Sequence, residues 1–386
     1  MKPATFGLLA GLTVVVVGGA WYASRSGSDG AGASTLPTRL FPEFAKRVND
    51  VASVEIEKGS EHVTLVKKDN LWTLANRGGY PVDFEKVKKA VMDVSNLEVL
   101  EAKTKNPAQY DKLDLQDPKE GAPSTRLTLK DAGGANLAAL IVGKSNWGGK
   151  ASVYVRKLDD AQSYLCQGEL RLEAGPTTWI KKDVLKLDRE RIRAVEVAHA
   201  DGETLRIQKQ LPEDVDFAVL DIPPTRELAS AGVAGQLGSV LTWVSVDDVA
   251  PLAEVGFDGL SVTTATFRTF DGLVIELRLA DKDGKSYAAM KASWEEPPAR
   301  PAPSESQPAS AASAKLKSAD AVRQEIEELN RAHGAWVYVL PSFKATSITK
   351  RMNDMLAPLP DPAAPIDEGQ PNALPPGHTA DDGHDH

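Results

Sequence analysis

Apolar and polar residues alternate over residues 51–74, and this is the period of half-buried β-strands. Val54 and Ile56 belong to one such strand, and Val63 and Leu65 belong to the next. The alternation therefore predicts neighbouring strands that turn one face toward a core and the other toward water.

A helix is expected directly after these strands. Asp83 can cap the free amides of a first helical turn, and the following apolar residues recur at spacings of three and four. The resulting stripe consists of Phe84, Val87, Val91, Val94 and Leu97. We expect this stripe and Trp72 to form the core of this part of the chain.

The same order of elements is expected a second time. Val195 and Val197 repeat the first strand, and Leu205 and Ile207 repeat the second. Thr225 can cap a second helix, whose expected core face consists of Leu237, Val240, Leu241 and Val244. The pattern predicts an α+β fold with two tandem homologous units, each an antiparallel sheet with one main packed helix.

These patterns divide the chain into five segments. We expect a membrane anchor over residues 1–24, a flexible linker over 25–40, a first unit over 41–188, a second unit over 189–356 and a tail over 357–386. The tail is rich in proline and acidic residues and has no apolar period, and this composition predicts disorder.

The second unit carries an insertion over residues 294–333. A stretch rich in Pro, Ala and Ser leads into a predicted helix over residues 320–333. Val322, Ile326 and Leu329 fall on one narrow face of this helix, and Gly334 can end it.

The N-terminal segment predicts a membrane span. No charged residue occurs from Phe6 to Ala23, and Lys2 precedes this stretch. A helix of this length reaches about 27 Å, close to the ~30 Å of a bilayer's hydrocarbon core. The positive charge before the span predicts a single pass with a cytoplasmic N-terminus and the body on the other side. A cleaved signal peptide is the alternative.

Charge and cysteine content exclude several classes of protein. The chain has 45 Lys and Arg residues against 54 Asp and Glu, a net charge of −9. This balance is not that of a nucleic-acid-binding protein. A single cysteine, Cys166, excludes an internal disulfide framework and every multi-cysteine metal site. Its place in an apolar strand predicts a buried side chain rather than a nucleophile.

The motifs suggestive of chemistry are incomplete. Gly143-Lys144-Ser145 resembles the end of a phosphate-binding loop, but Ala138 stands where that loop needs glycine, so we expect a connection between strands. Residues 281–284 resemble the start of a calcium loop but lack its later ligands, and a hairpin turn is expected.

The histidines form no recognisable site either. His62, His199 and His333 are scattered along the chain, whereas His378, His384 and His386 lie among aspartates in the tail, where they could hold a metal loosely. We favour a solvated tail, because ordering it would cost conformational entropy. We therefore predict no catalytic residue, no cofactor-binding residue and no metal site.

The sequence resembles the bacterial DUF4340 family of membrane-anchored proteins. The resemblance covers residues 51–356. It rests on the N-terminal anchor, the opening strand at Val54, the segment 71–74, the helix after Pro81, the element Tyr110-Asp111-Lys112-Leu113-Asp114, and residues 141–143 running to 154–156. Tyr110-Asp111 departs from the commoner Tyr-Gly of that element. Members are typically encoded beside ABC-type transporter subunits, including those resembling gliding-motility components, so the resemblance implies an accessory protein of the bacterial inner membrane with a periplasmic body. It implies no catalytic residues.

We therefore expect a non-catalytic interaction protein that binds ABC-type transporter subunits or other envelope proteins. The insertion helix and the span from Phe6 to Ala23 are the expected docking elements. The alternative is a periplasmic module that binds envelope polysaccharide or lipid in a groove between the two units. An enzyme would need convergent acids or a nucleophile with a base, and the sequence indicates neither.

Overall fold

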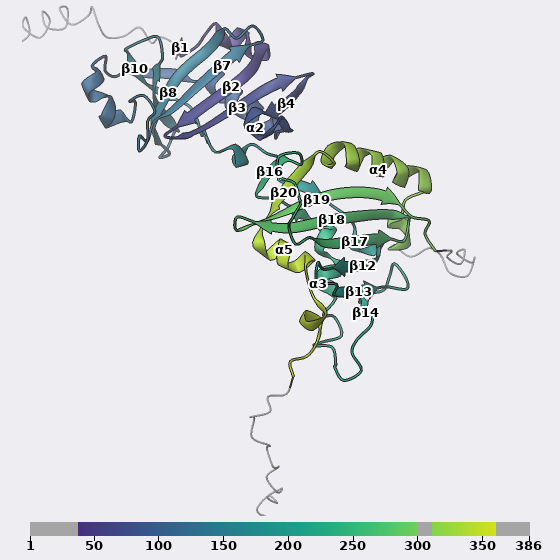
Figure 1. Ribbon diagram of the computed structural model, residues 1–386. Helices are drawn as coiled ribbons and strands as arrows, with labels where there is room; N and C mark the ends of the chain where they lie inside the picture. Colours follow the sequence, from purple (N-terminus) through teal and green to yellow (C-terminus); the bar gives the residue numbers. More distant parts are fainter. Residues whose placement is uncertain (1–37, 299–310, 360–386) are drawn as a thin grey trace, which may run out of the picture. The chain divides into compact units, whose positions relative to one another are not determined.

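The computed structural model describes residues 38–298 and 311–359. The chain divides into two compact units (Figure 1). The first comprises the described residues up to Lys181 together with Asp248–Ala250, and the second comprises the rest. The predicted span from Phe6 to Ala23 and the residues from 360 onward lie outside the described residues. Within the described ranges, no helix is long and apolar enough to cross a membrane.

The first unit is built on a ten-stranded antiparallel sheet with the order β1-β6-β10-β9-β8-β7-β2-β3-β4-β5. The strands are β1 Thr38–Arg39, β2 Val51–Lys58, β3 Glu61–Lys68, β4 Leu71–Leu74, β5 Tyr80–Pro81, β6 Glu98–Ala102, β7 Thr125–Asp131, β8 Asn136–Asn146, β9 Ser152–Lys157 and β10 Ser163–Gln167. The alternation predicted for residues 51–74 is confirmed, because Val54, Ile56, Val63 and Leu65 are all buried on one face.

Helix α2 (Phe84–Ser95) crosses from β5 to β6. The Asp83 carboxylate accepts a hydrogen bond from the Glu85 N–H, as the capping pattern predicted. Val87, Val91 and Val94 are buried and Trp72 is buried with them, but Phe84 is 54% exposed and does not belong to the core. Phe84 is the first residue of the helix, and helical side chains lean toward the N-terminus, so its ring projects beyond the turn that packs on the sheet.

The second large sheet has eight strands with the order β14-β13-β12-β17-β18-β19-β20-β16, and all but β16 lie wholly in the second unit. Its strands are β12 Ile192–Ala198, β13 Thr204–Gln208, β14 Ala218–Val219, β16 Asp248–Pro251, β17 Thr263–Thr269, β18 Leu273–Lys282, β19 Lys285–Trp294 and β20 Trp336–Leu340. A small two-stranded sheet pairs β11 (Asp183–Leu185) with β15 (Val244–Ser245).

The prediction of a long helix that begins at Thr225 is wrong. Only α3 (Gly235–Gly238) and a 3₁₀ turn over Val240–Thr242 form in this region. Glycines weaken a long helix here, and Gly238 is needed because a Cβ at this position would lie 2.2 Å from the ring of Phe217. The packing prediction is nevertheless confirmed, because Leu237, Val240, Leu241 and Val244 are all buried.

The two large sheets share a strand order. In the first unit, β4-β3-β2-β7-β8-β9-β10-β6 are consecutive neighbours, and in the second, β14-β13-β12-β17-β18-β19-β20-β16 follow the same sequence of connections. The connection that differs most between the two sheets is the one that follows β9 in the first and β19 in the second. Residues 158–162 join β9 to β10, whereas the connection from β19 to β20 contains helix α4 (Ala319–His333). Helix α5 (Ser342–Ile348) then follows β20.

Candidate interaction surface on helix α4

Helix α4 has well-defined ends. The Ser318 hydroxyl accepts a hydrogen bond from the Ala321 N–H at the N-terminus, and Gly334 follows the last helical residue. The predicted helix over residues 320–333 and its termination at Gly334 are therefore confirmed.

The inner face of α4 packs on β18 and β19 (Figure 1). Val322 is fully buried, while Ile326 and Leu329 are partly buried. Toward the C-terminal end, the Asn330 side-chain amide accepts a hydrogen bond from the Ala292 N–H and donates one to the Ala292 carbonyl, both at 2.8 Å. This pairing satisfies backbone groups of β19 and fixes the helix along the strand.

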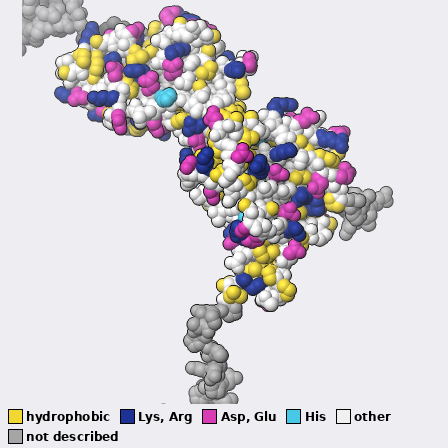
Figure 2. Space-filling view, viewed as in Figure 1, with side chains coloured by type: hydrophobic (Ala, Val, Ile, Leu, Met, Phe, Trp, Pro, Cys, Tyr) yellow, Lys and Arg dark blue, Asp and Glu magenta, His cyan; other side chains and the backbone are white. Residues whose placement is uncertain are grey.

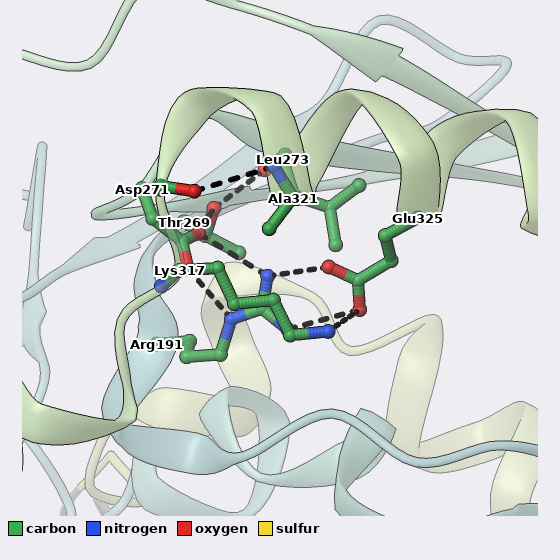
Figure 3. A network of polar contacts seen from close by, with 8 residues as sticks. Arg191, Thr269, Asp271, Leu273, Lys317, Ala321 and Glu325 are labelled. Carbon is green, nitrogen blue, oxygen red and sulfur yellow. Dashed lines mark hydrogen bonds and ion pairs between the residues drawn. The ribbon is translucent and has the colours of Figure 1, made fainter.

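A buried charge network holds the N-terminal half of α4 (Figure 3). Arg191 Nε donates to Asp271 Oδ2 at 2.8 Å, and Arg191 Nη2 donates to Glu325 Oε2 at 2.8 Å. The side chains of Arg191 and Asp271 are only 4% and 1% exposed. One guanidinium thus joins the segment before β12, the turn after β17 and helix α4.

Further donors complete the coordination of Asp271. Thr269 Oγ1 donates to Asp271 Oδ1 at 2.6 Å, and the Lys317 N–H donates to Asp271 Oδ2 at 3.0 Å. The Lys317 ammonium lies 3.0 Å from Glu325 Oε1. A buried charge is tolerated only where partners of this kind replace its water.

The network shifts the pKa values of both carboxyl groups. Burial raises the pKa of Asp271, but hydrogen bonds from Arg191, the Lys317 amide and Thr269 outweigh it, so the pKa lies below its usual value. Burial likewise raises the pKa of Glu325, but the hydrogen bonds from Arg191 and Lys317 outweigh this effect, so the pKa of Glu325 also lies below its usual value. Both carboxyl groups are therefore ionised at neutral pH.

The outer face of α4 carries charges of both signs. Its exposed polar residues are Asp320, Arg323, Gln324, Glu327, Glu328 and Arg331. Figure 2 shows lysine and arginine side chains interspersed with acidic side chains over the visible surface. Beside the helix, a shallow groove runs along Lys317, Gln324 and Glu328. A rigid helix with a patterned polar face can recognise a partner of complementary charge.

The incomplete motifs have structural roles. Asp283 and Gly284 form the two-residue turn between β18 and β19, with φ of 51° and 72°. This geometry belongs to a tight hairpin turn, as predicted. Gly143-Lys144-Ser145 lies inside β8 at a β-bulge rather than in a connection between strands.

The histidines are not brought together. His199 is buried, with Nε2 3.2 Å from the Lys350 carbonyl and Nδ1 3.3 Å from Thr263 Oγ1. His333 Nδ1 lies 2.6 Å from the Tyr338 hydroxyl, and His62 is exposed on β3. In the part of the chain that the structure describes, no three His, Cys, Asp or Glu residues are grouped so that they could hold a metal ion. The tail histidines lie outside that part.

Cys166 is fully buried in β10, as predicted, and burial raises the pKa of its thiol to about 12. The charge network, in contrast, was not predicted from the sequence. Asp271 and Glu325 lie 80 and 134 residues after Arg191 in the sequence, and no local pattern distinguishes the three from surface charges.

Comparison with known proteins finds one family that matches part of the chain. Residues 72–258 match the family described as Domain of unknown function (DUF4340). No curated protein and no solved structure matches the chain. The matched segment begins at the buried Trp72 of β4 and ends just after Phe257, so it takes in the Tyr110 element and the paired strands β7 to β10. The resemblance to the DUF4340 family expected from those residues is confirmed over residues 72–258.

Proposed function

We propose that this protein is a non-catalytic accessory protein of the bacterial inner membrane that binds a subunit of an ABC-type transporter through the outer face of α4. The observation that carries the proposal is the way α4 is held. A buried charge network and the Asn330 pairing fix the helix on the sheet, while its charged outer face is exposed. Such rigidity lowers the entropic cost of binding.

The membrane location is part of the proposal and rests on the sequence. Lys2 followed by the uncharged stretch from Phe6 to Ala23 supports a single span with a periplasmic body. Retention of the protein in membranes washed with alkaline carbonate is the expected result. Release into the soluble fraction would contradict the anchor.

We also propose that the two units arose by duplication. The shared order of eight strands in each sheet supports this origin. The alternation of apolar and polar residues around Val54, which recurs around Val195, supports it too. Under this proposal, α4 is an addition to the second copy, and an added element on a retained sheet is a reasonable place for a new binding function.

A crosslinking experiment tests the docking site. In cells producing the full-length protein, a photo-crosslinking residue at Glu327 on α4 should capture a permease or ATPase subunit of an ABC-type transporter. The same residue at Lys88, exposed on α2, serves as the matched control. Capture of transporter subunits from both positions equally, or from neither, would contradict α4 as the docking element.

Charge reversal provides a second test. The double variant Glu327→Lys with Glu328→Lys should reduce capture at least about tenfold, because rim charges steer and orient association. The control Lys88→Glu with Lys89→Glu reverses two exposed charges on α2 and should leave capture unchanged.

A further inference from the structure

A groove on the first unit has a different character from the surface of α4. Its volume is about 440 Å³, within the range of small-molecule sites. Thr125, Val142, Leu170 and Leu172 form a buried floor, while Lys58, Trp147 and Arg171 stand exposed around it. The groove lies entirely within the first unit.

The Gly143-Lys144-Ser145 sequence shapes this groove. Val142 pairs with Val155, but Ser145 pairs with Val153, so β8 contains one extra residue between them. A Cβ at Gly143 would lie 2.1 Å from the Leu113 carbonyl oxygen, and only glycine fits. Bulges of this kind redirect the side chains that follow.

The extra residue determines which side chains face the groove. Lys144 is turned to the opposite side of the sheet, where its Nζ donates to the Lys112 carbonyl at 2.8 Å. Ser145 and Trp147 lie on the same side of the sheet as Val142 and line the groove with it. In a regular strand, Lys144 would share the side of Val142 instead.

Trp147 is held in position without being buried. The Arg171 guanidinium lies 4.4 Å from the centre of the indole, and Arg171 Nε is 2.8 Å from Glu169 Oε1. Trp147 nevertheless remains 50% exposed. An oriented, exposed tryptophan at the side of a groove is typical of a surface that stacks against a ligand ring.

We propose that this groove binds an acidic oligosaccharide, with one sugar ring against the indole of Trp147 and a carboxylate at Arg171 and Lys58. Lys58 and Arg171 are the cations that line the groove, Glu173 is its acidic side chain, and Glu169 beside it pairs with Arg171 Nε. The planar guanidinium of Arg171 matches the geometry of a ligand carboxylate. The hydroxyl-bearing residues Thr125 and Ser145 suit a polar ligand better than a lipid chain. The proposal is independent of the function proposed for α4.

Calorimetric titration of the full-length protein in detergent tests the site, with alginate oligomers as the acidic probe and malto-oligosaccharides as the neutral probe. Alginate oligomers should bind, and binding should weaken with added salt, because the carboxylate contacts are partly screened. Trp147→Ala should weaken binding about tenfold or more, whereas Trp147→Phe should restore most of it by keeping an aromatic face.

Trp243 provides the matched control. It is 54% exposed on the second unit and has Lys186 at 4.4 Å from its ring, but it does not line this groove. Trp243→Ala should leave binding unchanged. Failure to bind alginate oligomers, equal binding of the neutral probe, or equal losses in the two alanine variants would overturn the proposal. Unchanged melting of both variants excludes misfolding as the cause.

Discussion

Individual residues on one apolar stripe have unequal roles in this protein. Val91 and Phe84 both belong to the apolar face of α2, yet Val91 is buried against the sheet and Phe84 is half-exposed. Periodicity identifies the face of a helix but not where the contact with the sheet begins. Phe84, the first residue of α2, lies beyond that contact, so the two positions should respond differently to the same substitution.

Val91→Asp should lower the free energy of unfolding of the first unit by about 4 kcal/mol or more, because it buries an unpaired carboxylate. Phe84→Asp introduces the same group at an exposed position and should change that free energy by no more than about 0.5 kcal/mol. Chemical unfolding followed by circular dichroism measures both. Similar losses in the two variants would mean that Phe84 packs in the core.

Cys166 should be unreactive in the folded protein. Burial raises the pKa of its thiol to about 12, so very little thiolate exists at pH 8, and the side chain is inaccessible. A colourimetric thiol reagent should react with it at least about a hundredfold more slowly than in the unfolded chain. Ser60→Cys adds a thiol at an exposed turn and should react at once. Rapid reaction of native Cys166 would contradict its burial.

At the scale of elements, α4 is held by charge as well as by apolar packing. Most residues of α4 are polar, and Val322 is its one fully buried residue. The Arg191 network therefore carries an unusual share of the attachment. Removing one partner of a buried ion pair is costly because the other charge remains buried without compensation.

Asp271→Asn should destabilise the second unit by about 3–5 kcal/mol at neutral pH. The pKa of Asp271 is lowered in the folded state, so its stabilising effect is complete above the unfolded-state pKa of about 3.9 and is lost as pH falls through the folded value. The difference between wild type and variant should therefore shrink below about pH 4. Unfolding titrations at pH 7 and pH 3 measure it.

A surface pair provides the control for that variant. Glu196 and Arg206 are 3.1 Å apart with side chains 38% and 49% exposed, and Glu196→Gln should change stability by no more than about 0.5 kcal/mol. A loss in Asp271→Asn as small as this would show that the network contributes little to holding α4.

Local patterns explain which elements could be predicted from the sequence. The strands around Val54 and Val63, the helices α2 and α4 and the turn at Asp283 all follow from periodicity, caps and turn residues, which act over a few positions. The region after Thr225 could not be predicted, because tertiary packing of Gly238 against Phe217 overrides an apparent helical stripe. Both the charge network and the groove depend on distant residues that only the folded sheet brings together.

At the scale of the whole molecule, the chain contains two large sheets, and each unit has its own buried core. The largest fully buried side chains include Ile56, Leu65 and Leu127 in the first unit and Phe267 and Leu187 in the second. A sheet with its own core is a cooperative unit of folding. Val91→Asp in the first unit and Asp271→Asn in the second should therefore act on separate unfolding transitions.

Thermal unfolding should occur in two steps, one for each unit, because no strand is shared between the two large sheets. Val91→Asp should abolish or lower only the first unit's transition, and Asp271→Asn only that of the second. Hydrogen exchange read on peptides from β2 and β7, and from β12 and β17, assigns each transition to its unit. A single transition that both variants shift equally would mean that the two units unfold as one, and the division at Lys181 would then not describe how the protein folds.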